Sequence, residues 1–258
     1  MTSEIELQSY NGFLITMLLL ALIVFLTLFL VPAGYGQLIK QKWGKSIKNK
    51  AGWVIMEVPV VILIWAFWLS SDRTLETTPL VFFAVFNLHY LQRTFVFPML
   101  IRGDDKMPLT IIIFGMLFNS ANAYMQGMWI FYYAPEGLYT DAWLKTPQFI
   151  IGLVIFLIGF FINIHSDHII RNLRKPGDTN FYIPKGGMFN YVTSANYFGE
   201  FTEWVGWAIM TLSFPGLVFA IWTFSNLGPR AHALRKWYIE KFGDEYPKSR
   251  KRMIPFIY

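Results

Sequence analysis

The residues most able to do chemistry in this chain are ionisable or hydrogen-bonding side chains inside strongly apolar segments. Glu57 lies in the run AGWVIMEVP, and His89, Tyr90 and Arg93 lie in the run NLHYLQRTF. An ionisable group in such a segment is costly unless it is paired or hydrated, so these groups mark functional sites by default. Glu57 therefore needs a partner or a chemical task. His89 and Arg93 are four residues apart and would share one helical face.

Amide side chains occupy another apolar segment, residues 108–131. Asn119 and Gln126 are seven residues apart, so a helix would place them two turns apart on one face. Taken alone, Asn122 or Gln126 is more often a bond between helices than a contact to a ligand. The pattern leaves both interpretations open.

Acidic residues form a third polar set in residues 190–211. Asn196, Glu200 and Glu203 recur at i, i+4 and i+7, which predicts one acidic stripe on a helix. One interpretation of Glu203 places it at the membrane edge, facing water. Polar groups on so many apolar segments together predict a shared internal cavity, either wet or filled by a ligand.

The run NIHSDHIIRNLRKPGD, residues 163–178, combines amide, carboxylate and basic groups. We expect most of it to form an inner loop beyond an apolar segment that ends at residue 165. Arginine forks suit phosphates, and carboxylates suit ribose hydroxyls or an amide. This mixture predicts a phosphate-bearing cofactor at the cytoplasmic face. Because no GxGxxG motif follows a predicted strand, helices and loops would have to hold any nucleotide.

Several kinds of site are excluded or disfavoured by the sequence. The chain has no cysteine, which excludes disulfides, thiolate catalysis and cysteine-ligated metals. Its four histidines form no HExxH motif, so we expect no metal site. No GxSxG elbow occurs either, which disfavours a serine hydrolase.

The composition indicates that a lipid bilayer surrounds the chain. Of its 258 residues, 55% are hydrophobic and only 15% are charged, whereas a soluble domain usually carries about 25% charged residues. The net charge of +6 comes from short basic clusters between apolar segments, which is typical of cytoplasmic loops and not of a nucleic-acid interface.

Seven apolar stretches predict seven transmembrane helices, because a crossing needs about 20 residues: 12–32, 52–70, 79–101, 108–131, 146–165, 190–211 and 215–238. Glu4 and Glu6 precede the first stretch, so we expect a retained span and not a signal peptide. With the N-terminus outside and the C-terminus cytosolic, 19 of the 22 Lys and Arg residues fall in inner segments or from Arg230 onward. That bias is what the positive-inside rule predicts.

The predicted fold is therefore an all-α, polytopic integral membrane protein with one domain, residues 1–258. The membrane would be the bacterial inner membrane or the endoplasmic reticulum, depending on the source. No internal repeat is visible, which disfavours a transporter built from repeated halves.

Several long motifs resemble those of the steroid 5α-reductases (3-oxo-5α-steroid 4-dehydrogenases). They are the run at 163–178, HYLQRTFVFPMLIRG, FNYVTSANYFGEFTEW, DEYPKSRKRMIPF and the segment from Trp53 to Glu57. The similarity covers roughly residues 50–258, and the first 50 match only in hydropathy. Polyprenol reductases and trans-2-enoyl-CoA reductases are looser relatives that share the C-terminal half.

This resemblance implies a seven-helix reductase that takes NADPH from the cytosol and a lipophilic, steroid-like substrate from the bilayer. About residues 1–101 would form the substrate side, and about 102–258 the cofactor side. Glu57 and Tyr90 would contact the substrate's 3-keto oxygen, with Trp53 and Met56 nearby. We expect a monomer surrounded by lipid, without metal or nucleic acid. The implied cofactor contacts are Arg93, Asn163, His165, Asp167, Arg171, Arg174, Tyr182, Lys185, Asn196, Glu200, Arg230 and Tyr238.

Some positions differ from the family pattern and bear on steroid preference. Met56 stands where steroid-reducing relatives often have Gln, and Leu234 where they usually have His. Asp104 and Asp105 replace residues that are often neutral or basic. The alternatives are a reductase of another lipid double bond (enoyl-CoA or polyprenol), a membrane methyltransferase, and a transporter.

Overall fold

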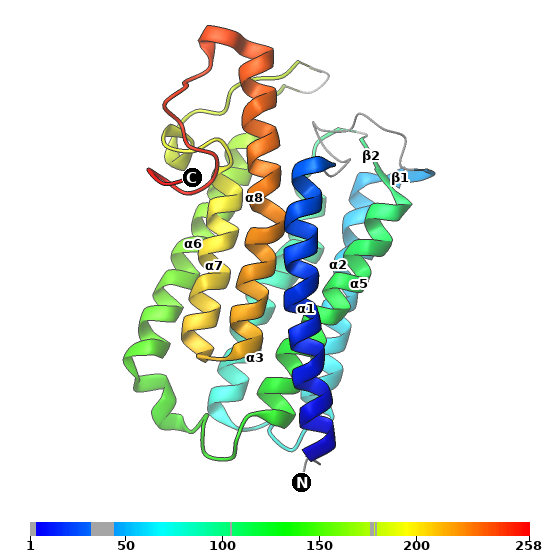
Figure 1. Cartoon of the computed structure of the whole chain (residues 1–258), viewed down its shortest axis with the longest axis vertical. Helices are drawn as coiled ribbons and strands as arrows, with labels where there is room; N and C mark the ends of the chain where they lie inside the picture. Colours follow the sequence, from blue (N-terminus) through cyan, green and yellow to red (C-terminus); the bar gives the residue numbers. More distant parts are fainter. Residues whose placement is uncertain (1–3, 32–43, 104, 176–177, 179) are drawn as a thin grey trace.

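Helices make up most of the computed structural model, which describes residues 4–31, 44–103, 105–175, 178 and 180–258 (Figure 1). The nearly all-α fold is therefore confirmed. Lys40, Lys42 and Asp104 lie outside the described residues. The long helices of the described part are α1 (Glu4–Leu30), α2 (Asn49–Leu69), α3 (Thr77–Leu91), α5 (Leu109–Met128), α6 (Pro147–Arg171), α7 (Ala195–Thr211) and α8 (Phe214–Phe242).

Shorter elements extend or join these helices. The helix α3 continues through a π-helical turn, η2 (Gln92–Val96), into α4 (Phe97–Leu100), and α5 continues into η3 (Trp129–Tyr133). Strands β1 (Ser46–Lys48) and β2 (Lys106–Pro108) form a small antiparallel ribbon with Ile47 opposite Met107. Strands of three residues leave no readable alternation, so the sequence did not predict them. The remaining short helices are η4 (Asp141–Lys145), η5 (Gly187–Asn190) and η6 (Gly243–Glu245).

Two helix boundaries differ from the prediction in ways that matter. The first helix begins at Glu4 and not at residue 12, because acidic groups in a first turn are favourable there. The helix α6 continues to Arg171, so the prediction of a loop from residue 166 was wrong. His168 and Arg171 lie in its last turn, where cations are favourable. Asp167 therefore sits on a rigid helix.

Four helices are long and apolar enough to cross a membrane by length and composition: Glu4–Leu30, Asn49–Leu69, Thr77–Leu100 and Pro147–Arg171. These helices and their neighbour α5 turn large apolar side chains outward. Phe114 and Leu117 of α5 are more than half exposed, as are Leu19 of α1 and Phe161 of α6. A soluble monomer rarely exposes such continuous apolar surface, which indicates an integral membrane protein. The count of seven spans and their orientation stay predictions.

Basic residues lie at both ends of the bundle. Figure 1 places the N-terminus at one end, and the C-terminal tail with β1 and β2 at the other. The end of the bundle that contains β1 and β2, here called the ribbon end, therefore carries Lys48 and Lys106. The connection between α2 and α3, which contains Arg73, lies at the opposite end.

Glycines allow α6 and α7 to pack backbone against backbone. A Cβ atom added at Gly152 or Gly159 of α6 would overlap main-chain atoms of α7. The same holds for Gly199 and Gly206 of α7 against α6. Small residues at helix contacts permit this close approach within membranes. This glycine-lined contact, here called the seam, fixes the carboxylates of α6 and α7 relative to each other.

The packing of α2 on α5 is different. A Cβ at Gly115 of α5 would meet only the Met56 side chain, and one at Gly127 would meet side chains that include Phe67. Side chains therefore separate these two backbones. The helix α3 lies between the two pairs, and Phe86 contacts Trp204 and Trp207 of α7 at ring-centroid distances of 5.9 and 5.4 Å.

Candidate active site

Glu57 projects from α2 and is 7% exposed. The Asn119 side chain of α5 donates to its Oε2 atom at 2.9 Å, and also to the main-chain oxygen of Met56 at 2.9 Å. A buried carboxylate needs such a partner to offset the loss of hydration. The sequence left open whether Glu57 has a partner or a chemical task, and the structure shows that Asn119 is a partner.

Tyr90 projects from α3 and is almost fully buried. The Asn122 side chain donates to its hydroxyl oxygen at 2.8 Å, while the ring packs on Phe86 at 4.7 Å and on Trp204 at 5.7 Å. Asn122 lies one helical turn beyond Asn119. Glu57 and Tyr90 therefore approach the same stretch of α5 from two different helices.

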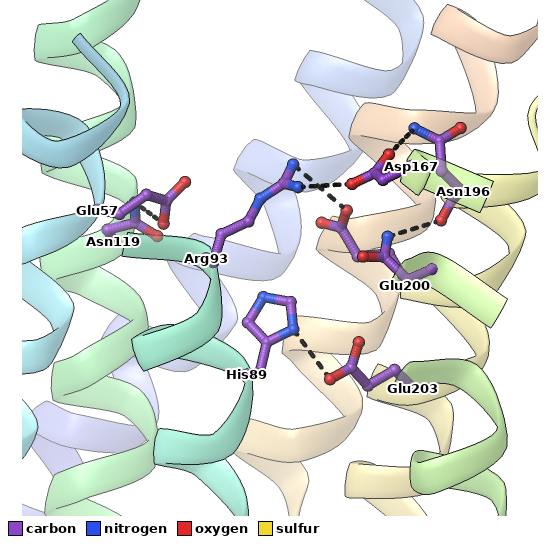
Figure 2. A network of polar contacts seen from close by, with 9 residues as sticks. Glu57, His89, Arg93, Asn119, Asp167, Asn196, Glu200 and Glu203 are labelled. Atoms are coloured by element: carbon purple, nitrogen blue, oxygen red, sulfur yellow. Dashed lines mark hydrogen bonds and ion pairs between the residues drawn. The ribbon is translucent and has the colours of Figure 1, made fainter. Parts of the chain in front are cut away.

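Arg93 follows on the π-helical turn and reaches toward α6 and α7 (Figure 2). Its guanidinium donates to Asp167 at 3.4 Å and lies 3.9 Å from Glu200. It also stacks over Trp53 and Phe97, with 4.5 and 4.3 Å to the ring centroids. Single π-helical turns occur frequently at functional sites. Side chains of α2, α4, α6 and α7 therefore meet at this one cation.

Amides complete the carboxylate cluster. The Asn196 side chain donates to Asp167 Oδ1 at 3.1 Å, and the Asn163 side chain donates to the Asn196 carbonyl at 2.9 Å. Of the residues predicted at the cofactor, Arg93, Asn163, Asp167, Asn196 and Glu200 thus form one connected cluster in the structure (Figure 2).

Sequence reasoning missed the pairing of His89 with Glu203. His89 Nδ1 lies 2.9 Å from Glu203 Oε1, and both side chains are buried. The interpretation that Glu203 faces water at the membrane edge was wrong, because it is 0% exposed. The sequence spacing of the charged residues could have predicted the His89–Glu203 pair. His89 and Arg93 are one turn apart, and so are Glu203 and Glu200, so two helices can match both cations to both carboxylates.

The structure also shows which groups the amide side chains of α5 bond to. Gln126 donates to the carbonyl of Pro215 at 3.0 Å and accepts from the Trp207 indole at 2.9 Å. Asn119 and Asn122 bond to Glu57 and Tyr90, as described above. These residues do join helices, as one interpretation proposed, but the groups that they join include the candidate catalytic pair.

Comparison with known proteins decides the family. The family model described as 3-oxo-5-alpha-steroid 4-dehydrogenase matches residues 105–258, which is more than half of the chain. This chain belongs to the steroid 5α-reductase family of oxidoreductases. The resemblance seen in the motifs is therefore confirmed.

Curated relatives match over most of their length. The 3-oxo-5-alpha-steroid 4-dehydrogenase 1 of Bos taurus is 41% identical over 242 residues, covering 92% of this chain and 93% of the relative. That of Homo sapiens is 44% identical and covers 82% and 81%. Steroid 5-alpha-reductase DET2 of Gossypium hirsutum is 36% identical and covers 95% and 96%. Similarity over 95% of the chain must include part of the first 50 residues, so it begins earlier than predicted.

The loop after α6 carries Arg174 and Tyr182, two further residues that the resemblance predicts at the cofactor. The Arg174 guanidinium lies over the Phe181 ring at 4.6 Å, and Lys241 of α8 lies over the same ring at 4.5 Å. The Tyr182 hydroxyl donates to Asp178 at 2.7 Å. This bond and the Asn180 amide lower the pKa of the Asp178 carboxyl below its ordinary value.

Four predicted residues lie apart from the Arg93 cluster. His165 is exposed and its ring is parallel to Phe161, with 5.9 Å between centroids. Arg171 bonds to His168 at 3.1 Å, and Lys185 is exposed. Met56 packs in a small apolar cluster with Met107 and Ile112.

The last helix contributes Arg230 and Tyr238, both buried. The Arg230 guanidinium lies 5.3 Å from the Tyr197 ring centroid on α7, and Tyr238 stacks on Tyr246 of the tail at 5.7 Å. The tail also pairs with the chain before α7, where the Ser194 amide donates to Arg252 at 3.1 Å. His232 accepts from Arg252 at 3.0 Å.

Proposed function

We propose that this protein uses NADPH to reduce the Δ4 double bond of 3-oxo-Δ4 steroids, giving 5α-reduced 3-oxo steroids. Curated relatives that match over most of the chain are named for this activity. The observation that carries the proposal is the approach of Glu57 and Tyr90 to one stretch of α5, where Asn119 and Asn122 hold them.

NADPH, when bound, supplies the hydride that adds to the β-carbon of the enone. This addition leaves negative charge on the 3-keto oxygen, and the Tyr90 hydroxyl donates a hydrogen bond to that oxygen. A donor aimed at developing charge in a water-excluded site is worth about 2.7–4 kcal/mol. Tyr90 is suited to this role because Phe86 and Trp204 fix its ring.

Glu57 acts beside Tyr90. Asn119 occupies one carboxyl oxygen, so a proton on the other oxygen can be donated to the ketone or can orient the phenol. After hydride addition the α-carbon takes up a proton, which completes the reduction. The protein contributes position and polarisation, and the reducing power belongs to the cofactor.

The residues present fit a nucleotide cofactor. Carboxylates and amides of α6 and α7 (Asp167, Glu200, Asn163 and Asn196) suit ribose hydroxyls and a carboxamide, and Arg93 joins them. Arg171, Arg174, Tyr182, Lys185 and His165 would meet the phosphates, and Arg230 and Tyr238 would close the site from α8. Within the described residues, the buried hydroxyls of Thr94, Ser166 and Ser194 have no hydrogen-bond partner. Buried polar groups normally have one, so these hydroxyls favour a polar ligand close by.

The membrane arrangement belongs to the same proposal. All seven long helices cross the bilayer, with the N-terminus outside and the basic ribbon end in the cytosol. NADPH then enters at the end that carries Arg174, and the steroid enters from the lipid. The substrate side, about residues 1–101, contributes Glu57, Tyr90, Trp53 and Met56. One chain is sufficient for both sites, so we propose a monomer.

NADPH oxidation by the purified protein tests the function. With testosterone or progesterone, we expect steroid-dependent loss of NADPH and a 5α-reduced product identified by mass spectrometry. NADPH alone and a 5α-reduced steroid serve as controls. Turnover of an enoyl-CoA or a polyprenol, with none of either steroid, would replace this proposal by that of another lipid reductase.

A further inference from the structure

We infer that Trp207, Gln126 and Asn122 form a one-way hydrogen-bond chain that makes Tyr90 a donor toward the substrate. This inference rests on the proposed function, because it explains how the Tyr90 hydroxyl remains available for a ketone. The three residues are positioning residues, and they act only through Tyr90.

The direction of the chain is fixed at Gln126. The Trp207 indole can only donate, so the Gln126 atom 2.9 Å from it must be the amide oxygen. The main-chain oxygen of Pro215 can only accept, so the Gln126 atom 3.0 Å from it must be the amide nitrogen. Two independent partners therefore give this amide the same orientation.

Gln126 then fixes the orientation of Asn122. The second hydrogen on the Gln126 nitrogen points to Asn122 Oδ1 at 3.3 Å, which makes that atom an acceptor. The remaining Asn122 atom is the nitrogen, and it donates to the Tyr90 oxygen at 2.8 Å. The donor and acceptor atoms of each hydrogen bond therefore determine the direction of the next one.

Tyr90 is the end of the chain. Because its oxygen accepts from Asn122, its own hydrogen is not used in that bond and can be donated to a carbonyl oxygen. If Asn122 had the opposite orientation, the phenol would donate to the amide and could not serve the substrate. Asn122, Gln126 and Trp207 are each at most 1% exposed. Without competing water, successive hydrogen bonds of one direction polarise each other.

Glu57 is also fixed as the acceptor of an amide hydrogen bond, for the same kind of reason. Asn119 donates to a main-chain carbonyl, which can only accept, so its nitrogen also faces the carboxylate. Two amides one turn apart on α5 therefore donate to one oxygen of Glu57 and to the oxygen of Tyr90, which leaves the Tyr90 hydrogen available.

The chain offers a matched control pair elsewhere. The Trp65 indole donates to Asn87 Oδ1 at 2.8 Å, and Asn87 donates to the carbonyl of Phe83 at 2.8 Å. Asn87 is buried on α3, one turn before Tyr90, but its side-chain bonds go to α2 and its own helix. The same substitutions can thus be made with and without a connection to Tyr90.

The experiment compares Asn122→Asp with Asn87→Asp, and Trp207→Phe with Trp65→Phe. Each variant is also made in the Tyr90→Phe background. An Asp at 122 cannot donate when ionised, so we expect kcat to fall about 10²-fold, as when a catalytic donor is lost. We expect a fall of about threefold to tenfold for Trp207→Phe, since its bond acts two links away. NADPH affinity should stay at the wild-type value in all four.

Non-additive losses of kcat in the double variants distinguish a positioning role from a general disturbance of the structure. In the Tyr90→Phe background, we expect neither Asn122→Asp nor Trp207→Phe to reduce kcat further. Equal losses in Asn122→Asp and Asn87→Asp, or an undiminished loss without Tyr90, would overturn the inference. If Asn122→Asp does not fold, Trp207→Phe and Trp65→Phe give the same comparison.

A spectroscopic measurement is independent of turnover. The Raman doublet of a tyrosine distinguishes a phenol that accepts a hydrogen bond from one that donates. We expect the difference between wild type and Tyr90→Phe to show an accepting phenol in the substrate-free protein, and a donating one in Asn122→Asp. A donating Tyr90 in the wild type would refute the chain, whereas failure of wild type to reduce a steroid would refute only the proposed function.

Discussion

Buried polar groups have different partners on the two sides of α3, which we call the amide side (toward α5) and the charged side (toward α6 and α7). Toward α5 the polar partners are neutral amides, and each one satisfies a single group of the candidate catalytic pair. Toward α6 and α7 the partners are carboxylates, which meet His89 and Arg93. Successive residues on a helix point about 100° apart, so one turn of α3 serves both sides.

Packing follows the same division. The charged side rests on a seam of four glycines, where the backbones of α6 and α7 touch. The amide side keeps its backbones apart with Met56 and Phe67. Ion pairs between buried groups are favourable only at good geometry, which requires fixed helices. The amide contact at Tyr90 tolerates more movement, because loss of that bond leaves no unpaired charge.

Substitutions in the catalytic pair should show the largest effect. We expect Tyr90→Phe and Glu57→Gln each to lower kcat about 10²- to 10³-fold, because the first removes the phenol donor to the developing oxyanion and the second removes the carboxyl proton. NADPH affinity, measured by fluorescence, should remain near the wild-type value, since the charged side is intact. Wild-type turnover in both variants would refute the proposed catalytic roles of Tyr90 and Glu57.

The two helix contacts should differ in their tolerance of a methyl group. Gly159→Ala places a Cβ against main chain, and we expect it to lower the free energy of unfolding by about 3 kcal/mol. Gly115→Ala meets only the flexible Met56 side chain, so about 1 kcal/mol is expected. Thermal unfolding in one detergent compares them, and equal losses would contradict the contrast.

Loss of the phosphate contact that we propose for Arg174 should have a smaller effect. We expect Arg174→Ala to weaken NADPH binding about tenfold, because one charge-assisted hydrogen bond is worth about 1.5 kcal/mol. At saturating NADPH, kcat should be unchanged. Lys48→Ala, which removes an exposed cation of β1 at the same end of the bundle, is the control. Unchanged affinity in Arg174→Ala would place the phosphates elsewhere.

The smallest effect should come from the turn at Asp178. Hydrogen bonds from Tyr182 and Asn180 lower the pKa of this carboxyl, so they favour its charged form. Their contribution to the turn is fully present above the ordinary carboxyl pKa, and it is lost as pH falls through the lowered one. We expect an NMR titration to show Asp178 below an ordinary Asp, and Tyr182→Phe to reverse the larger part of that shift. An Asp178 that titrates at its ordinary value would show that these bonds do not form.

The sequence predicted the helices well because hydropathy is a local property. Apolar stretches of sufficient length located α2, α5 and the continuous segment from α3 through η2 to α4 within a few residues, and the motifs indicated the family. It was less successful at helix ends. The polar run that includes Asp167 read as a loop, yet apolar Ile164 and Ile169 and a favourable last turn keep it helical.

What the sequence by itself determined is the kind of residue available: a carboxylate and a phenol in apolar helices, and a mixed charged run suited to a nucleotide. Only the tertiary structure decided which partner each group has. Glu203 joined His89, Asn119 joined Glu57, and Gln126 joined Trp207. The physical reason is that a buried polar group must be satisfied by some other one, but which one is near depends on how the helices pack.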